Sequence, residues 1–311
     1  MTTYSLSTMW AQQQRFADMH DFVRAAQSMG YDAIEVSHAT PEEPFARLLG
    51  GSGARLSSIH APAPKVDVNG RSNGSLNLAS LDGEERRTAI EQTKRSIDHA
   101  SAAGARYVIV HLGGIGNEML ASERKMRKLY DSGTRTGPEQ DILRKETWER
   151  RAELAPPYLE RARETLAELA AYAQERGVGL GLENRLHHHE IPLVDEALAF
   201  VADYPPDLVG HRPAVVGYWH DVGHAEVQAR LGYVDKRAWL DMLGPRTLGC
   251  HLHDVDGIGD HRAPGLGDVE WDYIASGLPP DALRVFEINQ REPAGAVAGA
   301  ISFLRGRGVV S

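Results

Sequence analysis

Cysteine is almost absent from the 311-residue chain. Cys250 is its only thiol, so no disulfide can form within the chain. This excludes the small disulfide-stabilised folds of secreted proteins and agrees with a reducing compartment. No segment approaches the roughly 18 consecutive apolar residues of a membrane-spanning helix, and the N-terminal segment lacks the pattern of a secretory leader. We therefore expect a cytoplasmic protein that does not enter a membrane.

Basic residues are also fewer than acidic ones. Lysine and arginine number 34 against 43 aspartates and glutamates, which gives a formal net charge of −9. Nucleic-acid binding normally depends on a basic face that releases counterions, and an acidic chain repels polyanions. The charge balance therefore argues against a nucleic-acid partner and favours a small-molecule substrate. It is compatible with a homo-oligomer.

A dinucleotide-binding fingerprint is missing as well. No G-x-G-x-x-G motif follows the first predicted strand and opens a helix, and the "GGIGN" segment after His111 lacks the third glycine. This absence weighs against an open, doubly wound nucleotide-binding sheet.

Short apolar runs alternate with longer amphipathic stretches along the whole chain. Eight strands are predicted, at residues 4–9, 32–37, 55–60, 106–111, 178–183, 215–221, 247–254 and 283–288. Helical spacing is clearest at 159–176, which Gly177 ends, and at 84–103, which Gly104 follows. Strands separated by helices must run parallel. Eight such units favour a single-domain (β/α)8 TIM barrel over residues 1–311.

Ionisable side chains stand where seven consecutive predicted strands end. In chain order they are Glu35, His60, His111, Glu183, Asp221, His253 and Glu287. Active sites of such barrels lie at the C-terminal strand ends, so these groups should converge there. Burying a carboxylate or imidazole without a partner is costly. A divalent cation, which neutralises carboxylates and accepts imidazole lone pairs, explains the pattern best.

Several short segments, taken together, resemble the xylose-isomerase-like TIM-barrel superfamily. This superfamily contains sugar isomerases and epimerases and also the apurinic endonuclease family 2 enzymes. The segments, which extend over almost the whole chain, are "SIHAP" (58–62), "VIVHLGG" (108–114), "GLEN" (181–184), "HDVGHA" (220–225), "HLHD" (251–254), "DHRAPGLG" (260–267) and "FEIN" (286–289).

The resemblance implies a ligand set for the metal. In the epimerase branch the ligands would be Glu183, Asp221, His253 and Glu287. A second metal or the substrate would contact residues from the set His60, His111, His224, Asp260, His261 and Arg262.

Two features depart from the pattern of the superfamily. Asp260 and His261 are adjacent, whereas multi-metal relatives separate the two ligands by one residue, and Arg262 is a candidate to replace a substrate-binding arginine. After Glu183, the chain continues with Arg185 and then "HHHE" at 187–190.

These residues are predicted to form the active site of a metal-dependent isomerase or epimerase acting on a sugar or a related polyhydroxy carbonyl compound. A manganese, cobalt or magnesium ion would polarise the carbonyl, and Glu183 and Glu287 would remove and return the proton of a neighbouring carbon through a cis-enediol. The alternatives are a multi-zinc phosphodiesterase of apurinic endonuclease type and a metal-dependent lyase or dehydratase on a related polyol. A catalytically inert barrel that binds a small molecule is also kept.

Other polar residues have less specific interpretations. His251 is expected to be an interior or supporting histidine, His38 a turn residue and the histidines at 187–189 a solvated loop. Glu35 is a candidate both for hydrogen bonding at the barrel mouth and for substrate contact. Residues 115–157, with nine basic and eight acidic side chains, are expected to form a lid or a helical insertion.

Overall fold

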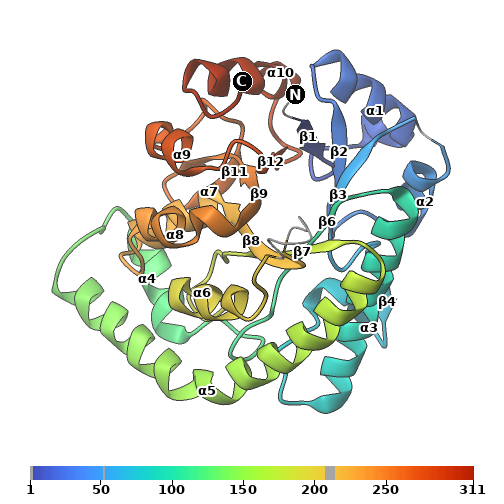
Figure 1. The fold of residues 1–311 in the computed structure, drawn as a ribbon. Coiled ribbons are helices and arrows are strands. Elements are labelled where there is room, and N and C mark those ends of the chain that lie inside the picture. The colour runs from blue at the N-terminus through green and yellow to red at the C-terminus, as the bar shows by residue number, and fades with distance from the viewer. Residues whose placement is uncertain (1–2, 52, 207–213) are drawn as a thin grey trace.

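The eight predicted strands form a closed parallel barrel, surrounded by helices (Figure 1). A computed structural model describes residues 3–51, 53–206 and 214–311. The barrel strands are β1 (Tyr4–Ser7), β2 (Ala33–Val36), β3 (Leu56–His60), β6 (Tyr107–Val110), β7 (Gly179–Glu183), β8 (Val216–Asp221), β9 (Thr247–Leu252) and β12 (Leu283–Phe286). Each pairs with the next barrel strand along the chain, and β12 closes the barrel on β1. The predicted (β/α)8 TIM barrel is confirmed.

Helices connect the barrel strands and cover the outside of the barrel. They are α1 (Met19–Ser28), α2 (Glu42–Leu49), α3 (Gly83–Ala103), α4 (Ala121–Asp131), α5 (Pro138–Glu175), α6 (Val194–Ala202), α7 (Val222–Arg230), α8 (Lys236–Leu243), α9 (Trp271–Gly277) and α10 (Ala294–Gly306). Short 3₁₀ helices occupy η1 (Gln14–Phe16), η2 (Asn73–Ser75) and η3 (Gly244–Arg246). Two small hairpins, β4 (Asp67–Val68) with β5 (Arg71–Ser72) and β10 (Asp254–Asp256) with β11 (Gly259–Arg262), lie outside the barrel sheet.

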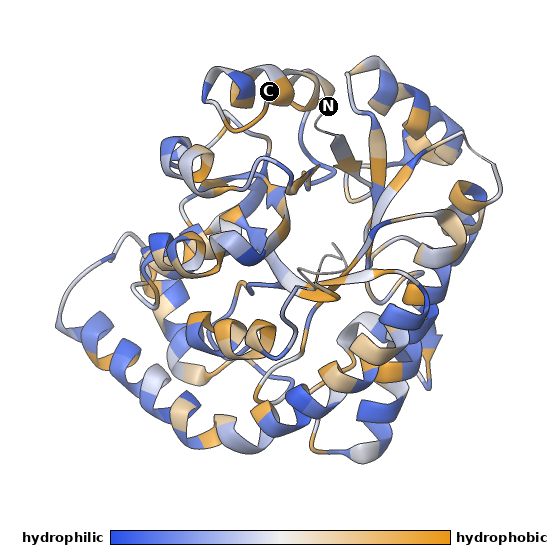
Figure 2. Ribbon diagram, viewed as in Figure 1, coloured by the Kyte–Doolittle hydropathy of each residue, from blue (hydrophilic) through white to orange (hydrophobic). Residues whose placement is uncertain are grey.

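The segment at 115–157 contains a helical insertion, as one of the two sequence interpretations predicts. It contains α4 and the first half of α5, which runs for 38 residues (Figure 1). Thr147 of α5 donates a hydrogen bond to Ser122 of α4 at 2.7 Å, and Lys125 pairs with Glu139 at 2.9 Å. Hydrophilic and hydrophobic residues alternate along α5, which buries Leu166 and Leu169 against the core (Figure 2).

The barrel interior contains an apolar layer, which consists of Tyr107, Ile109, Trp219, Leu283 and Val285. Glycines on the neighbouring strands make room for the indole ring of Trp219. A Cβ atom at Gly181 would lie 2.8 Å from Trp219 Cε3, and one at Gly249 would lie 2.4 Å from Cζ3. Both distances are shorter than a van der Waals contact, so glycine is required where the indole approaches the backbone.

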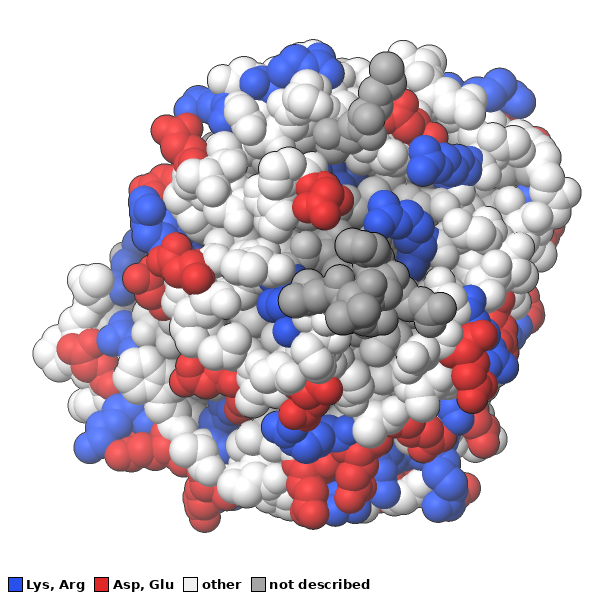
Figure 3. Space-filling model, viewed as in Figure 1, with Lys and Arg blue, Asp and Glu red and all other residues white. Residues whose placement is uncertain are grey.

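The surface mixes both signs of charge. Acidic and basic side chains are interspersed over the face displayed in Figure 3. Within the described part of the chain, every helix is too short or too polar to cross a lipid bilayer.

Candidate metal centre

Above the apolar layer, the barrel interior holds a second layer made of ionisable side chains. We call it the ionisable layer, and it consists of Glu35, His60, Glu183, Asp221, His251, His253 and Glu287, all of them buried. Side chains on one face of a strand alternate with those on the other, so residues two positions apart face the same way. Asp221 therefore follows Trp219 into the interior, and Glu287 follows Val285. His251 joins the two layers, because its ring centroid lies 5.4 Å from that of Trp219.

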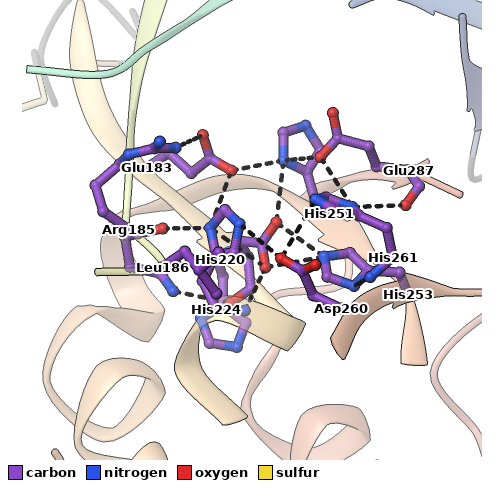
Figure 4. Close-up of polar contacts among 12 residues, drawn as sticks. Glu183, Arg185, Leu186, His220, His224, His251, His253, Asp260, His261 and Glu287 are labelled. Atoms are coloured by element: carbon purple, nitrogen blue, oxygen red, sulfur yellow. Dashed lines mark hydrogen bonds and ion pairs between the residues drawn. The ribbon is translucent and has the colours of Figure 1, made fainter. Parts of the chain in front are cut away.

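A central group of four side chains lies in the middle of this layer. Glu183, Asp221, His251 and Glu287 offer ligand atoms that all lie within 4.8 Å of one another. The carboxylates of Glu183 and Glu287 meet at His251, whose Nδ1 lies 3.0 Å from Glu183 Oε1 and 3.3 Å from Glu287 Oε2 (Figure 4). Three of the four ligands implied by the sequence therefore converge, and they do so on a histidine expected to play a supporting part.

His253, the fourth implied ligand, lies next to this group. Its Nε2 is 3.0 Å from both carboxylate oxygens of Asp221, and its Nδ1 accepts a hydrogen bond from the backbone N–H of His261 at 2.9 Å. Gly223 makes this position available, since a Cβ atom there would lie 2.1 Å from His253 Cε1. A cation held by Asp221 could therefore also bind His253 Nε2.

His251 is already held on both sides of its ring. Its Nε2 lies 2.9 Å from Glu35 Oε1, and Ser58 donates a hydrogen bond to the other oxygen of Glu35 at 2.7 Å. This chain of contacts agrees with the expected supporting role of His251, although the residue also belongs to the central group. Of the two interpretations of Glu35, hydrogen bonding within the barrel is the one that these contacts favour.

Opposite charges stabilise each other within the ionisable layer. Burial raises the pKa values of Glu183 and Asp221, but the surrounding histidines outweigh it and hold both well below the usual range. Against the effect of burial, Asp221 also raises the pKa of His253, but the hydrogen bond that His253 Nδ1 accepts from the His261 backbone N–H favours the neutral ring. For His60, the effect of burial is likewise outweighed by Glu183 and Glu287, and the pKa is about 9. The layer thus pairs carboxylates with imidazolium cations, a charge pattern that a metal ion could replace.

A first outer group flanks the central one. It consists of His60, His111 and Glu183. His111 Nε2 lies 2.6 Å from His60 Nε2 and 2.5 Å from Glu183 Oε2. Arg185 also contacts His111, and burial together with this guanidinium lowers the pKa of His111 to about 3.

A second outer group, made of His224, Asp260 and His261, lies on the other side. Asp260 Oδ2 is 3.7 Å from His224 Nε2 and 3.6 Å from His261 Nε2. Adjacent residues on a regular strand point to opposite faces, but His261 adopts a left-handed backbone conformation with φ of 56°. The departure in spacing at Asp260 and His261 is thereby accommodated.

Arg262 lies apart from these groups. Its guanidinium pairs with Glu292 and, at 3.3 Å, with Asp256.

The structure departs from the sequence expectations at several other histidines. The expectation of a solvated loop at 187–189 is wrong for His188 and His189, which are 2% and 8% exposed. His187 Nδ1 lies 3.2 Å from Glu123, a buried carboxylate of α4. His38 is more than a turn residue, since its ring centroid lies 4.9 Å from that of His60. No sequence pattern indicated either contact, because both depend on how loops from distant parts of the chain meet.

Comparisons with known proteins agree with this architecture. The sequence profile described as the xylose isomerase-like TIM barrel matches residues 23–306. A D-tagatose 3-epimerase-like protein superposes with a TM-score of 0.66 at 17% identity, over 98% of each chain. D-psicose 3-epimerase from Clostridium cellulolyticum H10 gives 0.66 at 15% identity over 100% of each chain. L-ribulose 3-epimerase gives 0.66 at 17% identity, over 99% of this chain and 95% of its own.

At these identities, the similarity to solved structures establishes the fold and leaves the activity open. No curated protein sequence matches the chain significantly. The match of the family profile extends over most of the chain, and the closed barrel agrees with it. The chain therefore belongs to the xylose isomerase-like TIM barrel family.

Proposed function

We propose that the protein is a divalent-metal-dependent isomerase or epimerase acting on a sugar or a related polyhydroxy carbonyl compound. The observation that carries this proposal is the meeting of Glu183 and Glu287 at one buried position. Glu183 is the last residue of β7, and Glu287 comes directly after β12. Their carboxylates approach the same His251 nitrogen at 3.0 and 3.3 Å. Two carboxylates on different sides of one carbon can remove a proton from one face and return it on another.

The residues of the central group fit a divalent cation. Carboxylates and imidazole together suit manganese, cobalt and magnesium better than a thiolate set would, and Cys250 does not belong to any of the groups. Glu287 Oε1 is buried and makes no hydrogen bond to the described residues, with His60 Nδ1 3.5 Å away, so it can serve as a ligand atom. Asp221, Glu183, Glu287 and one of the histidines His251 and His253 would hold the ion. When bound, the ion would polarise the substrate carbonyl and acidify the neighbouring C–H bond.

Proton transfer would then be the work of the two glutamates. Nearby histidines hold the pKa values of both well below the usual range, so both are ionised in the metal-free protein. Asp221, fixed by His253 and by the backbone N–H of His224 at 2.7 Å, would serve as a ligand.

The structural neighbours support a sugar-like substrate. Their names give a D-tagatose 3-epimerase-like protein, a D-psicose 3-epimerase and an L-ribulose 3-epimerase, and carbon 3 of a 2-ketose lies beside its carbonyl. A small ligand at the end of the barrel also agrees with the interspersed surface charges (Figure 3). A lyase or dehydratase would use the same proton removal with loss of a leaving group.

The multi-zinc phosphodiesterase is a second candidate, because two outer groups with metal-binding side chains flank the central group. Zinc favours such imidazole-rich sets. Arg185 contacts His111 of the first outer group, and a guanidinium at this place argues against a second metal ion there, which weakens this alternative.

The proposal can be tested with Glu287→Gln, which keeps the shape of the side chain and removes its charge. The matched control is Glu292→Gln, which alters a buried carboxylate that pairs with Arg262 outside the groups. Solvent deuterium incorporation into a ketose panel should fall about 10²- to 10⁴-fold in Glu287→Gln and stay near the wild-type rate in the control. Undiminished exchange in Glu287→Gln would remove Glu287 from the mechanism. A product lighter by one water would favour the dehydratase.

A further inference from the structure

Arg185 follows β7 and is fixed in place by its own loop. Its Nε and Nη2 atoms lie 3.2 and 2.9 Å from Glu190 Oε1, and the other oxygen of Glu190 accepts a hydrogen bond from the His187 backbone N–H at 2.9 Å. Gln228 of α7 donates a hydrogen bond to the backbone oxygen of Arg185. The side chain is 13% exposed. A guanidinium held in this way is preorganised, so little entropy is lost when it acts.

The remaining nitrogen of this guanidinium faces the first outer group. Arg185 Nη1 contacts His111 Nε2. It also lies 3.3 Å from Glu183 Oε2 (Figure 4). These two atoms, with His60 Nε2, are the ligand atoms that a cation in the first outer group would need. A positive charge of the protein itself therefore lies at the side of this group.

The second outer group differs in this respect. Among the described residues, no lysine or arginine forms an ion pair with His224, Asp260 or His261. The nearest arginine in sequence, Arg262, is paired with Glu292 and Asp256. The two outer groups thus contain similar ligand types but only the first is supplied with a guanidinium.

We propose that Arg185 is a built-in cation that takes the place of a second metal ion at His60, His111 and Glu183. The guanidinium is always ionised, and its Nη1 atom lies against His111 Nε2 and Glu183 Oε2, the atoms that a divalent ion at this position would need. Its consequence for catalysis rests on the proposed function: with Arg185 in this place, the site would hold one metal ion for isomerase chemistry and not several for hydrolysis.

The same geometry bears on the substrate. Glu190 already neutralises Arg185, and Glu183 lies beside it. Arg185 therefore offers a hydrogen-bond donor without a net positive field. This arrangement suits a hydroxyl or carbonyl oxygen of an uncharged polyol better than a phosphate group.

The test is a count of bound metal in Arg185→Met, which keeps the length of the side chain and removes its charge. Chelator-stripped protein is loaded with manganese or zinc, and bound ions are measured by elemental analysis after equilibrium dialysis. We expect Arg185→Met to bind one ion more per chain than the wild type. The gain should disappear in Arg185→Met/His111→Ala, and Arg185→Lys should show no gain.

Two controls keep the outcome specific. Arg262→Met removes a guanidinium outside the first outer group and should leave the count unchanged. His111→Ala alone should also leave it unchanged, because in the wild type no ion uses His111. An unchanged count in folded Arg185→Met would overturn the proposal. So would loss of an ion in His111→Ala alone, a measurement that applies even where Arg185→Met does not fold.

The counts are independent of the proposed activity. An extra ion in Arg185→Met together with an inactive wild type on every ketose would support the role of Arg185 and contradict the isomerase proposal. An active wild type with the same count in Arg185→Met would support the isomerase and contradict the role of Arg185.

Discussion

Two layers of side chains fill the barrel, and their chemistry is opposite. The apolar layer packs Trp219 between strand glycines, while the ionisable layer, two residues further along the same strands, buries carboxylates against imidazoles. Burial of apolar surface stabilises the fold, but a buried charge costs free energy unless its partners compensate for it. The comparison suggests that the first layer stabilises the barrel and that the second is maintained for chemistry.

The largest effect should follow from emptying the apolar layer. Trp219→Ala removes a fully buried indole, and we expect unfolding free energy to fall by about 3–5 kcal/mol because a cavity remains. Urea denaturation measures the loss. Trp148→Ala is the matched control, since this tryptophan on α5 is 45% exposed and its loss should change stability by only about 0.5 kcal/mol. Equal losses in both variants would contradict a stabilising role specific to the layer.

The ionisable layer should instead make the metal-free protein sensitive to pH. His60 has a pKa of about 9 when folded, above the value of about 6.5 expected in the unfolded chain. The folded state therefore binds its proton more tightly. This contribution to stability is complete below pH 6.5 and is lost as pH rises towards 9, on the order of 3 kcal/mol.

Other groups of the layer should make the metal-free protein less stable at acidic pH. The pKa values of His111 and His220 are lowered to about 3, and those of Glu183 and Asp221 are also depressed. These groups lose stabilisation as pH falls below the unfolded values. Thermal unfolding of the metal-free protein should therefore show maximal stability near pH 6.5. Metal loading should flatten the alkaline side, and a metal-free curve that is flat from pH 6.5 to 9 would contradict this interpretation.

A smaller loss of unfolding free energy is expected when a strand glycine that contacts the apolar layer is replaced. A methyl group at Gly249 would lie 2.4 Å from Trp219 Cζ3, so Gly249→Ala should destabilise the fold by about 1–3 kcal/mol through overpacking. Gly299→Ala provides the control, because space is open around that position in α10, and removing a helical glycine should stabilise by about 0.5–1 kcal/mol. The two changes should therefore have opposite signs in urea denaturation.

The last prediction concerns metal affinity and a glycine next to the ionisable layer. Gly223→Ala would push the imidazole of His253 away from Asp221, since the new methyl group would lie 2.1 Å from His253 Cε1. If His253 is a ligand, metal affinity measured by calorimetry should fall about 10- to 100-fold, as for other changes that disturb ligand orientation. Gly295→Ala, with open space around it, should not change affinity. Unaltered affinity in Gly223→Ala would favour His251 as the imidazole ligand.

The sequence predicted the layers better than the contacts within them. Period-two alternation places Glu183, Asp221 and Glu287 in the interior once the strands are known, and all three converge. The relative height of His251 and His253 could not be predicted, since it depends on register between strands. Asp221 pairs with His251 after a register shift between Tyr218 and Trp219, which brings His251 level with the central carboxylates.

Contacts made by loops were less predictable still. Arg185 and His38 reach the first outer group from segments without strand periodicity. His261 faces the second outer group because its backbone is left-handed, a conformation uncommon in residues other than glycine. The contact between His187 and Glu123 required knowledge of where α4 packs.

The most direct test of the account is the metal content of protein purified without chelator, compared with that of Asp221→Asn. Asp221 is the carboxylate shared by the central group and His253, so its loss should disable either ligand arrangement. The account predicts bound manganese, cobalt or magnesium in the wild type. A folded Asp221→Asn protein should lose both the metal and the solvent exchange activity. A wild type that binds no metal under any loading condition would contradict the central claim that the ionisable layer is a metal centre.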